Sequence, residues 1–261
     1  MTAHLQQKQV LITRHEPKAS EFATRITKAG GKAFITPLIN VACKVLDEKR
    51  KFLQQIEHYE WIIFTSANGV HCFFSALHRF ASHMDERVKL ATVGPKTNAA
   101  LTKFGFEADF IPSRYDAKTM SVEFLQNRIV KGPILLVRGQ LSGTVLQEVL
   151  GKNAVPFDSL EVYETTTNVN IKQRLQVILE KETIDFITFT SPSTVDAFVD
   201  LMPDYQCYLD RAVVCIGTTT AKRAKEYGFR HLLVPNEFTT EGMIQKIADY
   251  ISEGTESYNA K

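Results

Sequence analysis

The 261-residue sequence lacks the features of several specialised classes of protein. It has no run of 18 apolar residues that could form a transmembrane helix, and its first apolar run, Val10 to Ile12, is too short for a signal peptide. It also lacks an excess of either charge, because 31 Lys and Arg residues face 29 Asp and Glu residues, a net charge of +2. Dedicated nucleic-acid-binding domains are usually more basic. We therefore expect a cytoplasmic protein that binds neither membranes nor nucleic acid.

Cysteine is scarce and shows no metal-binding or redox spacing. The four cysteines (Cys43, Cys72, Cys207 and Cys215) are widely separated, and no C-x-x-C occurs. This pattern favours reduced thiols in a cytosolic protein. The seven histidines form no ligand-spaced pair with these cysteines, so we expect no metal site.

Familiar phosphate-binding and nucleophile motifs are missing as well. The sequence contains neither G-x-x-x-x-G-K-[ST] nor G-x-G-x-x-G, which disfavours nucleotide binding. The nucleophile elbow G-x-S-x-G is also absent.

The most informative feature that is present is an internal duplication. Phe64-Thr65-Ser66 returns as Phe189-Thr190-Ser191, Gly94 returns as Gly217, and Leu11–Arg14 returns as Leu135–Arg138, each about 124 residues later. Solenoid repeats are only 20–50 residues long, so this period indicates two similar domains. The chain length and the 44% hydrophobic content suit two globular domains.

Each repeat alternates strand and helix patterns. In the first repeat, short apolar runs predict strands at 10–13, 33–36, 61–65, 89–93 and 107–111, and helical patterns cover 17–29, 68–80, 96–104 and 118–130. Strands that are apolar on both faces, separated by helices, are typical of a parallel sheet covered on both sides. The sequence therefore predicts an α/β fold with two doubly wound parallel sheets.

Small polar residues follow most of the predicted strands. In open α/β sheets ligands bind beyond the carboxyl ends of the strands, and helix N-termini there favour anions. Serine and threonine are also ordinary N-caps, so capping alone is the alternative for each turn. The paired pattern favours a polyanionic ligand with carboxylates or phosphates. The candidate binding residues are Arg14, Ser66, Ala67, Gly94, Lys96, Thr97, Arg138, Gly139, Ser191, Ser193, Thr194, Gly217, Thr219 and Thr220.

Four side chains near these turns have two possible roles each. Arg14 and Arg138 end matching strands and could each hold a carboxylate in a two-pronged contact, or form an internal ion pair. Lys96 presents the same alternatives. Tyr163 could be a core or hinge residue, or a proton donor. His15 is the histidine closest to the predicted site.

Several segments, in this order and spacing, resemble the uroporphyrinogen-III synthase family. The resemblance covers about Val10 to Ile251, and it rests on the combination of segments, since each one alone is unspecific. They are Thr13-Arg14, Phe64–Val70, Val93–Thr97, Leu101-x-x-x-Gly105-Phe106, Val137–Gly139, Glu161–Thr165, Thr190–Val195 and Ile216–Ala221.

The resemblance implies an activity and an arrangement of domains. The family converts the linear tetrapyrrole hydroxymethylbilane to uroporphyrinogen III, with loss of water and inversion of the last pyrrole ring, in haem biosynthesis. It uses no cofactor, and its members are expected to be monomers. The implied fold has two flavodoxin-like domains, residues 1–36 plus 167–261 and residues 42–160. Extended linkers at 37–41 and 161–166 would join them, with the active site in the cleft between them.

The resemblance also suggests residue roles. Tyr163 matches a tyrosine suspected of assisting departure of the hydroxyl group, and Ser66, Thr97, Ser191 and Thr219 match positions that line the cleft. The sequence departs from the family pattern at two turns. Thr218 stands where many members have proline, and His15 replaces a proline common after the Thr-Arg pair.

A second function class fits the same pattern. Two α/β lobes around a hinge also describe non-catalytic modules that bind a tetrapyrrole or another anion, and a fold does not determine function. The short polar tail after Ile251 carries no effector domain, which weighs against a sensor. The lack of a conventional base beside the Ser/Thr turns weighs against a sugar-phosphate enzyme.

Overall fold

The chain forms two compact units, each with its own sheet. The computed structural model describes residues 4–80, 83–127 and 130–259. Unit 1 combines Met1–Asn40 with Thr166–Lys261, and unit 2 is Val41–Thr165. Unit 2 is therefore continuous in sequence, whereas unit 1 is built from both ends of the chain.

Unit 1 contains a five-stranded sheet in the order β10-β9-β8-β1-β2. All of its neighbouring strands pair in parallel. Read in sequence order within the unit this is 2-1-3-4-5, the flavodoxin-like order. The strands are β1 (Gln9–Ile12), β2 (Lys32–Ile35), β8 (Phe186–Phe189), β9 (Ala212–Cys215) and β10 (His231–Leu233).

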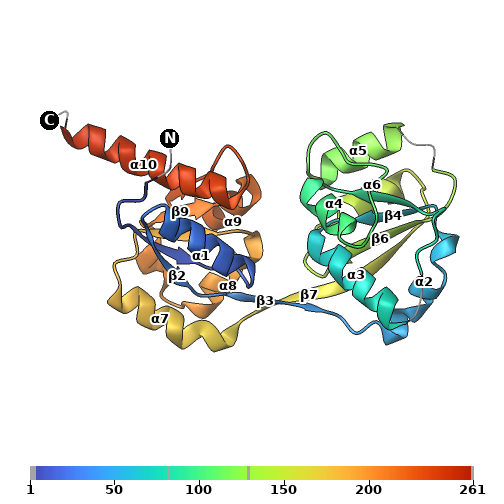
Figure 1. Cartoon of the computed structure of the whole chain (residues 1–261), viewed down its shortest axis with the longest axis horizontal. Helices are drawn as coiled ribbons and strands as arrows, with labels where there is room; N and C mark the ends of the chain where they lie inside the picture. Colours follow the sequence, from blue (N-terminus) through green and yellow to red (C-terminus); the bar gives the residue numbers. More distant parts are fainter. Residues whose placement is uncertain (1–3, 81–82, 128–129, 260–261) are drawn as a thin grey trace. The chain divides into compact units, whose positions relative to one another are not determined.

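Helices α1 and α10 cover one face of this sheet with apolar side chains at helical spacing. Phe22 and Ile26 of α1 are one turn apart and pack with Val10 and Ile12 of β1 and with Met243 of α10. Accordingly, α1 and α10 lie side by side over the sheet in Figure 1. The helices of unit 1 are α1 (Lys18–Lys28), α7 (Lys172–Lys181), α8 (Pro192–Leu201), α9 (Thr218–Glu226) and α10 (Thr240–Asn259).

Unit 2 has a related five-stranded sheet, which gains an edge strand that unit 1 lacks and has only a bridge at Phe110 in place of a counterpart to β10. Its sheet has the order β3-β7-β6-β4-β5, and the pairs β7-β6, β6-β4 and β4-β5 are parallel. The strands are β3 (Ile39–Cys43), β4 (Trp61–Phe64), β5 (Lys89–Thr92), β6 (Ile134–Gly139) and β7 (Phe157–Thr167). The helices are α2 (Arg50–Gln54), α3 (Ala67–Arg79), α4 (Pro95–Thr102), α5 (Ala117–Asn127) and α6 (Val145–Lys152). Short 3-10 turns occupy Asp47–Lys49 and Ile56–His58 in unit 2, and Val169–Ile171 and Tyr205–Tyr208 in unit 1.

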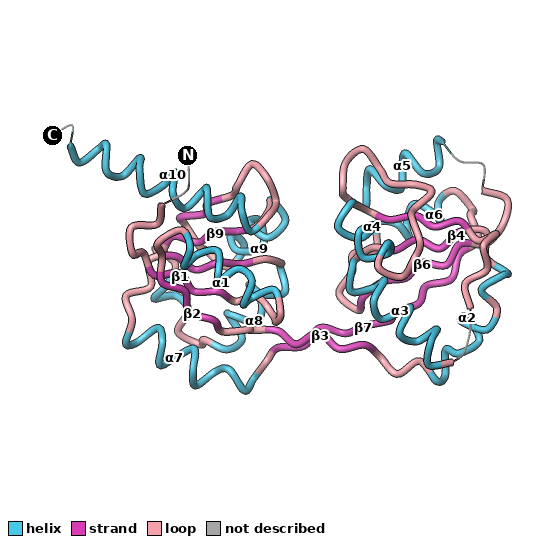
Figure 2. The backbone as a smooth tube through the Cα atoms, viewed as in Figure 1, coloured by secondary structure: helices cyan, strands magenta, loops and turns pink. Residues whose placement is uncertain are grey.

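Alternate residues of a strand point to opposite faces of the sheet, which explains why β4 is apolar throughout. The Trp61 ring packs on Phe124 of α5 with ring centroids 4.9 Å apart. On the other face, the Phe64 ring packs on Phe73 of α3 at 5.3 Å. Helices flank the strands of each unit on two sides (Figure 2), and in unit 2 they bury both faces of the sheet.

The observed architecture confirms the predicted α/β fold with parallel, doubly wound sheets. One predicted strand, 107–111, is reduced to a single bridge between Ala91 and Phe110. The predicted helix 118–130 begins at Ala117, and its residues 128–129 lie outside the described residues. Most of the segments predicted as linkers, 37–41 and 161–166, lie in the neighbouring strands β3 and β7, and the Lys44 N–H donates to the Val162 carbonyl over 2.9 Å just beyond β3.

The structure corrects the prediction that all four cysteines are reduced. Cys43 at the end of β3 and Cys72 within α3 form a disulfide, with Cα atoms 5.2 Å apart. Their 29-residue separation forms no local motif, and the fold brings them together. Cys207 is free and exposed, and Cys215 is free and buried.

Among the described residues, no helix has both the length and the apolar character needed to cross a membrane.

Candidate functional site

The predicted site residues lie in the turns that follow the strands of each sheet. In unit 1 these turns follow β1, β8 and β9, which are neighbours in the sheet, and in unit 2 they follow β4, β5 and β6. The carboxyl ends of parallel strands meet at one edge of a sheet. Each unit thus gathers its own set of candidate residues at one edge.

The two serines cap equivalent helices. Ser66 Oγ accepts the Gly69 N–H over 3.0 Å at the start of α3. Ser191 Oγ accepts the Thr194 N–H over 3.3 Å at the start of α8, and Thr194 Oγ1 accepts the Ser191 N–H over 3.2 Å, which completes a capping box. Ser193 Oγ lies 2.8 Å from Ser191 Oγ. Capping therefore accounts for Thr194, which is buried, while Ser66, Ser191 and Ser193 stay partly accessible.

The other pair of helices begins at glycine. Gly94 precedes α4 and Gly217 precedes α9, and neither helix has a side-chain cap. Thr97 and Thr220 in the first turns are buried. Lys96 and Thr219 are exposed, and Ala67, in the first turn of α3, is partly buried.

The two matched arginines differ in their environments. Arg138 is buried, and its guanidinium donates to Gln147 Oε1 and to the carbonyl oxygens of Ser142 and, over 3.3 Å, Gly139. These acceptors are neutral, so Arg138 braces the loop after β6 through hydrogen bonds and not through the ion pair considered above. The sequence does not mark Gln147 and Ser142 for this role, because a glutamine in a helix and a serine in a loop are common whether or not they bind an arginine.

Arg14 has an unsatisfied donor. Its Nε is buried without a hydrogen-bond partner in the described part of the chain, and burial lowers the pKa of this guanidinium. An unpaired buried donor is costly, so the position favours an acceptor supplied by a ligand. Burial and the neighbouring charges of Lys18 and Arg14 also lower the pKa of His15, so the imidazole is less readily protonated than usual.

Tyr163 meets two other candidate residues at the edge of unit 2. Ser66 Oγ donates to Tyr163 Oη over 3.1 Å. The Tyr163 ring lies directly on Gly139, where an added Cβ would be only 2.2 Å from Tyr163 Cζ. The strand register shifts between Arg138 and Gly139, which sets Gly139 opposite Tyr163. Since the phenol oxygen accepts the bond from Ser66, the Tyr163 proton can be donated to a ligand.

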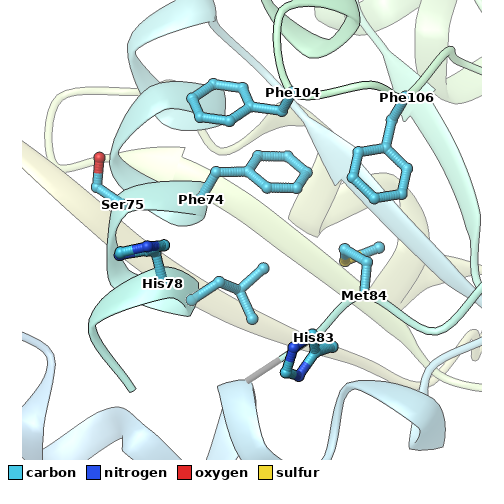
Figure 3. Close-up of a pocket in the computed structure, with 8 residues that line it drawn as sticks. Phe74, Ser75, His78, His83, Met84, Phe104 and Phe106 are labelled. Carbon is cyan, nitrogen blue, oxygen red and sulfur yellow. The ribbon is translucent and has the colours of Figure 1, made fainter. Parts of the chain in front are cut away.

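A described cavity lies elsewhere in unit 2. It has a volume of about 810 Å³ and is lined by side chains of α3 and of the loops near α4, among them Phe74, Phe104, Phe106, His78 and His83 (Figure 3). None of the predicted site residues, all of which the structure describes, lines it. Its lining contains no lysine or arginine, so it does not match a polyanionic ligand.

The described residues also contain no group of three His, Cys, Asp or Glu side chains that could hold a metal ion.

Comparison with known proteins identifies the family. A family model for uroporphyrinogen-III synthase HemD matches residues 20–245, which is most of the chain. The chain belongs to the uroporphyrinogen-III synthase family. This is a family of enzymes, the cyclising lyases.

Relatives of this synthase family match along nearly the whole chain. A putative uroporphyrinogen-III synthase of Methanocaldococcus jannaschii is 30% identical over 91% of this chain and 97% of its own length. A porphyrin biosynthesis protein HemD of Ruminiclostridium josui is 29% identical over 92% of this chain, which spans only 48% of that protein. A solved uroporphyrinogen III synthase of Thermus thermophilus shares the fold, with a TM-score of 0.71 at 15% identity, over 94% of this chain and 99% of that one.

Proposed function

We propose that this protein is a uroporphyrinogen-III synthase that converts hydroxymethylbilane to uroporphyrinogen III and water, with inversion of the terminal pyrrole ring. The observation that carries the proposal is the family match over residues 20–245. The product belongs to haem biosynthesis.

We assign the first step to Tyr163. The bond between the substrate's terminal carbon and its hydroxyl oxygen breaks, and the departing hydroxide takes the phenolic proton and leaves as water. Electrons of the pyrrole ring stabilise the cation that remains. When the attacked ring returns to aromaticity it loses a proton, which can restore the phenol. The hydrogen bond from Ser66 supports this role, because it orients the phenol and leaves its proton free.

Substrate carboxylates are proposed to bind at the polar turns. Arg14 is the favoured cation, because its buried Nε lacks an acceptor among the described residues. Ser66, Ser191 and Ser193, with the exposed Lys96 and Thr219, are proposed to hold the remaining polar groups. Arg138 is proposed to act on the substrate less directly than Arg14, because its Nε, Nη1 and Nη2 each already donate to Gly139, Gln147 or Ser142.

The remaining catalytic task is orientation of the reacting ring. The cation is reactive without an enzyme and would close to the uninverted isomer I, so the protein has to steer which carbon attacks. Correct positioning alone can supply a large rate effect. Positioning of the ring requires no metal or organic cofactor, so the proposal includes none. The proposal is also that the enzyme acts as a monomer.

The test is the isomer composition of the product. Purified protein given freshly prepared hydroxymethylbilane should yield mainly isomer III, with one water lost for each ring closed. A product that contains only isomer I would contradict the proposal. Saturable tetrapyrrole binding without turnover would instead support the non-catalytic binding module.

A further inference from the structure

Two exposed aromatic side chains occupy equivalent positions in the two units. Tyr115 is 65% exposed and Phe238 is 51% exposed. Each lies three residues after a proline, Pro112 or Pro235, and both follow the glycine that precedes α4 or α9 at the same distance in sequence. The duplication therefore places one exposed aromatic ring in each unit, at the same place in the fold.

Both rings pack on the glycine that precedes the neighbouring helix. A Cβ added to Gly94 would lie 3.0 Å from Tyr115 Cβ and 3.3 Å from its Cγ. A Cβ added to Gly217 would lie 3.3 Å from Phe238 Cδ2 and 3.4 Å from its Cγ. Both contacts are tight, so a larger residue would displace the ring.

The backbone does not explain these glycines. Gly94 has φ −174° and Gly217 has φ −166°, extended values that any residue adopts. Serine occupies the corresponding cap positions of α3 and α8, where its hydroxyl accepts a backbone N–H of the first turn. The glycines are therefore best explained by the rings that lie against them.

The position of the rings suits the aromatic part of a tetrapyrrole. Both lie against residues that follow β5 or β9, at the same sheet edges as the proposed binding turns. The substrate combines anionic side chains with electron-rich pyrrole rings that carry N–H donors. Polar turns suit the anions but leave the pyrrole faces without an apolar partner. A phenyl or phenol ring supplies one, through offset stacking or by accepting an N–H on its face.

We propose that Tyr115 and Phe238 are substrate-binding residues, each with a ring that contacts a pyrrole ring of the tetrapyrrole. This rests on the proposed function and extends it to the aromatic part of the substrate. Gly94 and Gly217 act as positioning residues, because they leave room for the aromatic rings.

Replacement of each ring by an aliphatic side chain tests the proposal. The variants Tyr115→Leu and Phe238→Leu keep apolar bulk but remove the aromatic face. We expect the KM for hydroxymethylbilane to rise about 3- to 10-fold in each, the range of one aromatic contact. Tyr115→Phe keeps the ring and should keep the wild-type KM. Because both side chains are exposed, the melting temperature should change little in all three variants.

The matched control is Phe104→Leu. Phe104 is also a partly exposed aromatic residue of unit 2, 38% exposed, but it lies beyond the opposite end of α4. An unchanged KM in both leucine variants would overturn the proposal, as would an equal rise in Phe104→Leu. Failure of the proposed function would look different, because wild-type protein itself would then form no isomer III.

Discussion

Tyr163 is held by neighbours that come from two other strands. Ser66 follows β4 and donates to the phenol oxygen, and Gly139 ends β6 and lies under the ring. This close approach explains why a side chain is excluded at Gly139. A single glycine therefore controls where the proposed proton donor sits.

Gly139→Ala should impair turnover through Tyr163. The new Cβ would lie 2.2 Å from Tyr163 Cζ, so the ring has to move away from Ser66. We expect kcat to fall about 100-fold, the lower end of the range for general acid catalysis, and Tyr163→Phe to give a similar fall with little loss of stability. Steady-state kinetics and thermal unfolding of both variants measure this.

Gly143→Ala is the matched control. Gly143 lies in the loop that follows Gly139, and a Cβ added there would have no atom within 4 Å. This variant should keep the wild-type kcat. If Gly139→Ala also kept the wild-type kcat, the function of Tyr163 would not require the space that Gly139 leaves for its ring. An unchanged kcat in Tyr163→Phe would remove the phenol from the chemistry.

The sequence alone could not assign the two matched arginines. The duplication gives Arg14 and Arg138 the same place at a strand end, and both were open to an internal or a ligand-binding role. Only the structure shows that the Arg138 guanidinium donates hydrogen bonds to Gln147 and to the Ser142 carbonyl. Arg14 Nε has no such acceptor among the described residues. Residue roles depend on side chains that meet from distant segments, which a periodic pattern does not encode.

Elements were predictable where a local signal is strong. The apolar runs at β4 and β8 and the serines that begin α3 and α8 are such signals, because burial on both faces and capping depend on adjacent residues. The expected strand at 107–111 failed because its pairing reduces to one bridge, at Phe110. The Cys43–Cys72 disulfide also escaped prediction, since it links an added strand to a helix across the fold.

Thiol titration checks this link between β3 and α3. Native protein prepared without reductant should show one fast thiol, the exposed Cys207. Burial raises the pKa of Cys215 to about 12, so almost none of it is reactive thiolate at pH 8. Unfolding without reductant should expose two thiols, and unfolding with reductant should expose four. Four thiols in unfolded, unreduced protein would show that Cys43 and Cys72 are not bonded.

At the scale of the whole molecule, the repeat and the structural units do not coincide. The first half of the sequence supplies β1 and β2 to unit 1 and β3, β4 and β5 to unit 2. The duplication shows that two similar domains exist, but periodicity alone cannot say which strands share a sheet. The pairing of β1 with β8 and of β4 with β6 settles that point.

A contiguous fragment tests the division into units. Residues 41–165 contain the sheet of unit 2 apart from the first residues of β3 and the last residues of β7, so this fragment should unfold in one cooperative transition. The control is residues 1–124, cut at the repeat boundary, which lack β6 and β7 of one sheet and β8 to β10 of the other. Circular dichroism during heating distinguishes them. A cooperative transition in the control but not in the 41–165 fragment would contradict the observed division.

The central claim is that this chain steers ring closure toward the inverted isomer. The most direct measurement is the fraction of isomer III formed from hydroxymethylbilane as protein concentration increases, with heat-denatured protein as the baseline. We predict that this fraction rises from the baseline and saturates near complete formation of isomer III, because enzymatic closure then outpaces spontaneous closure to isomer I. A fraction that stays at the heat-denatured baseline at every protein concentration would contradict the account.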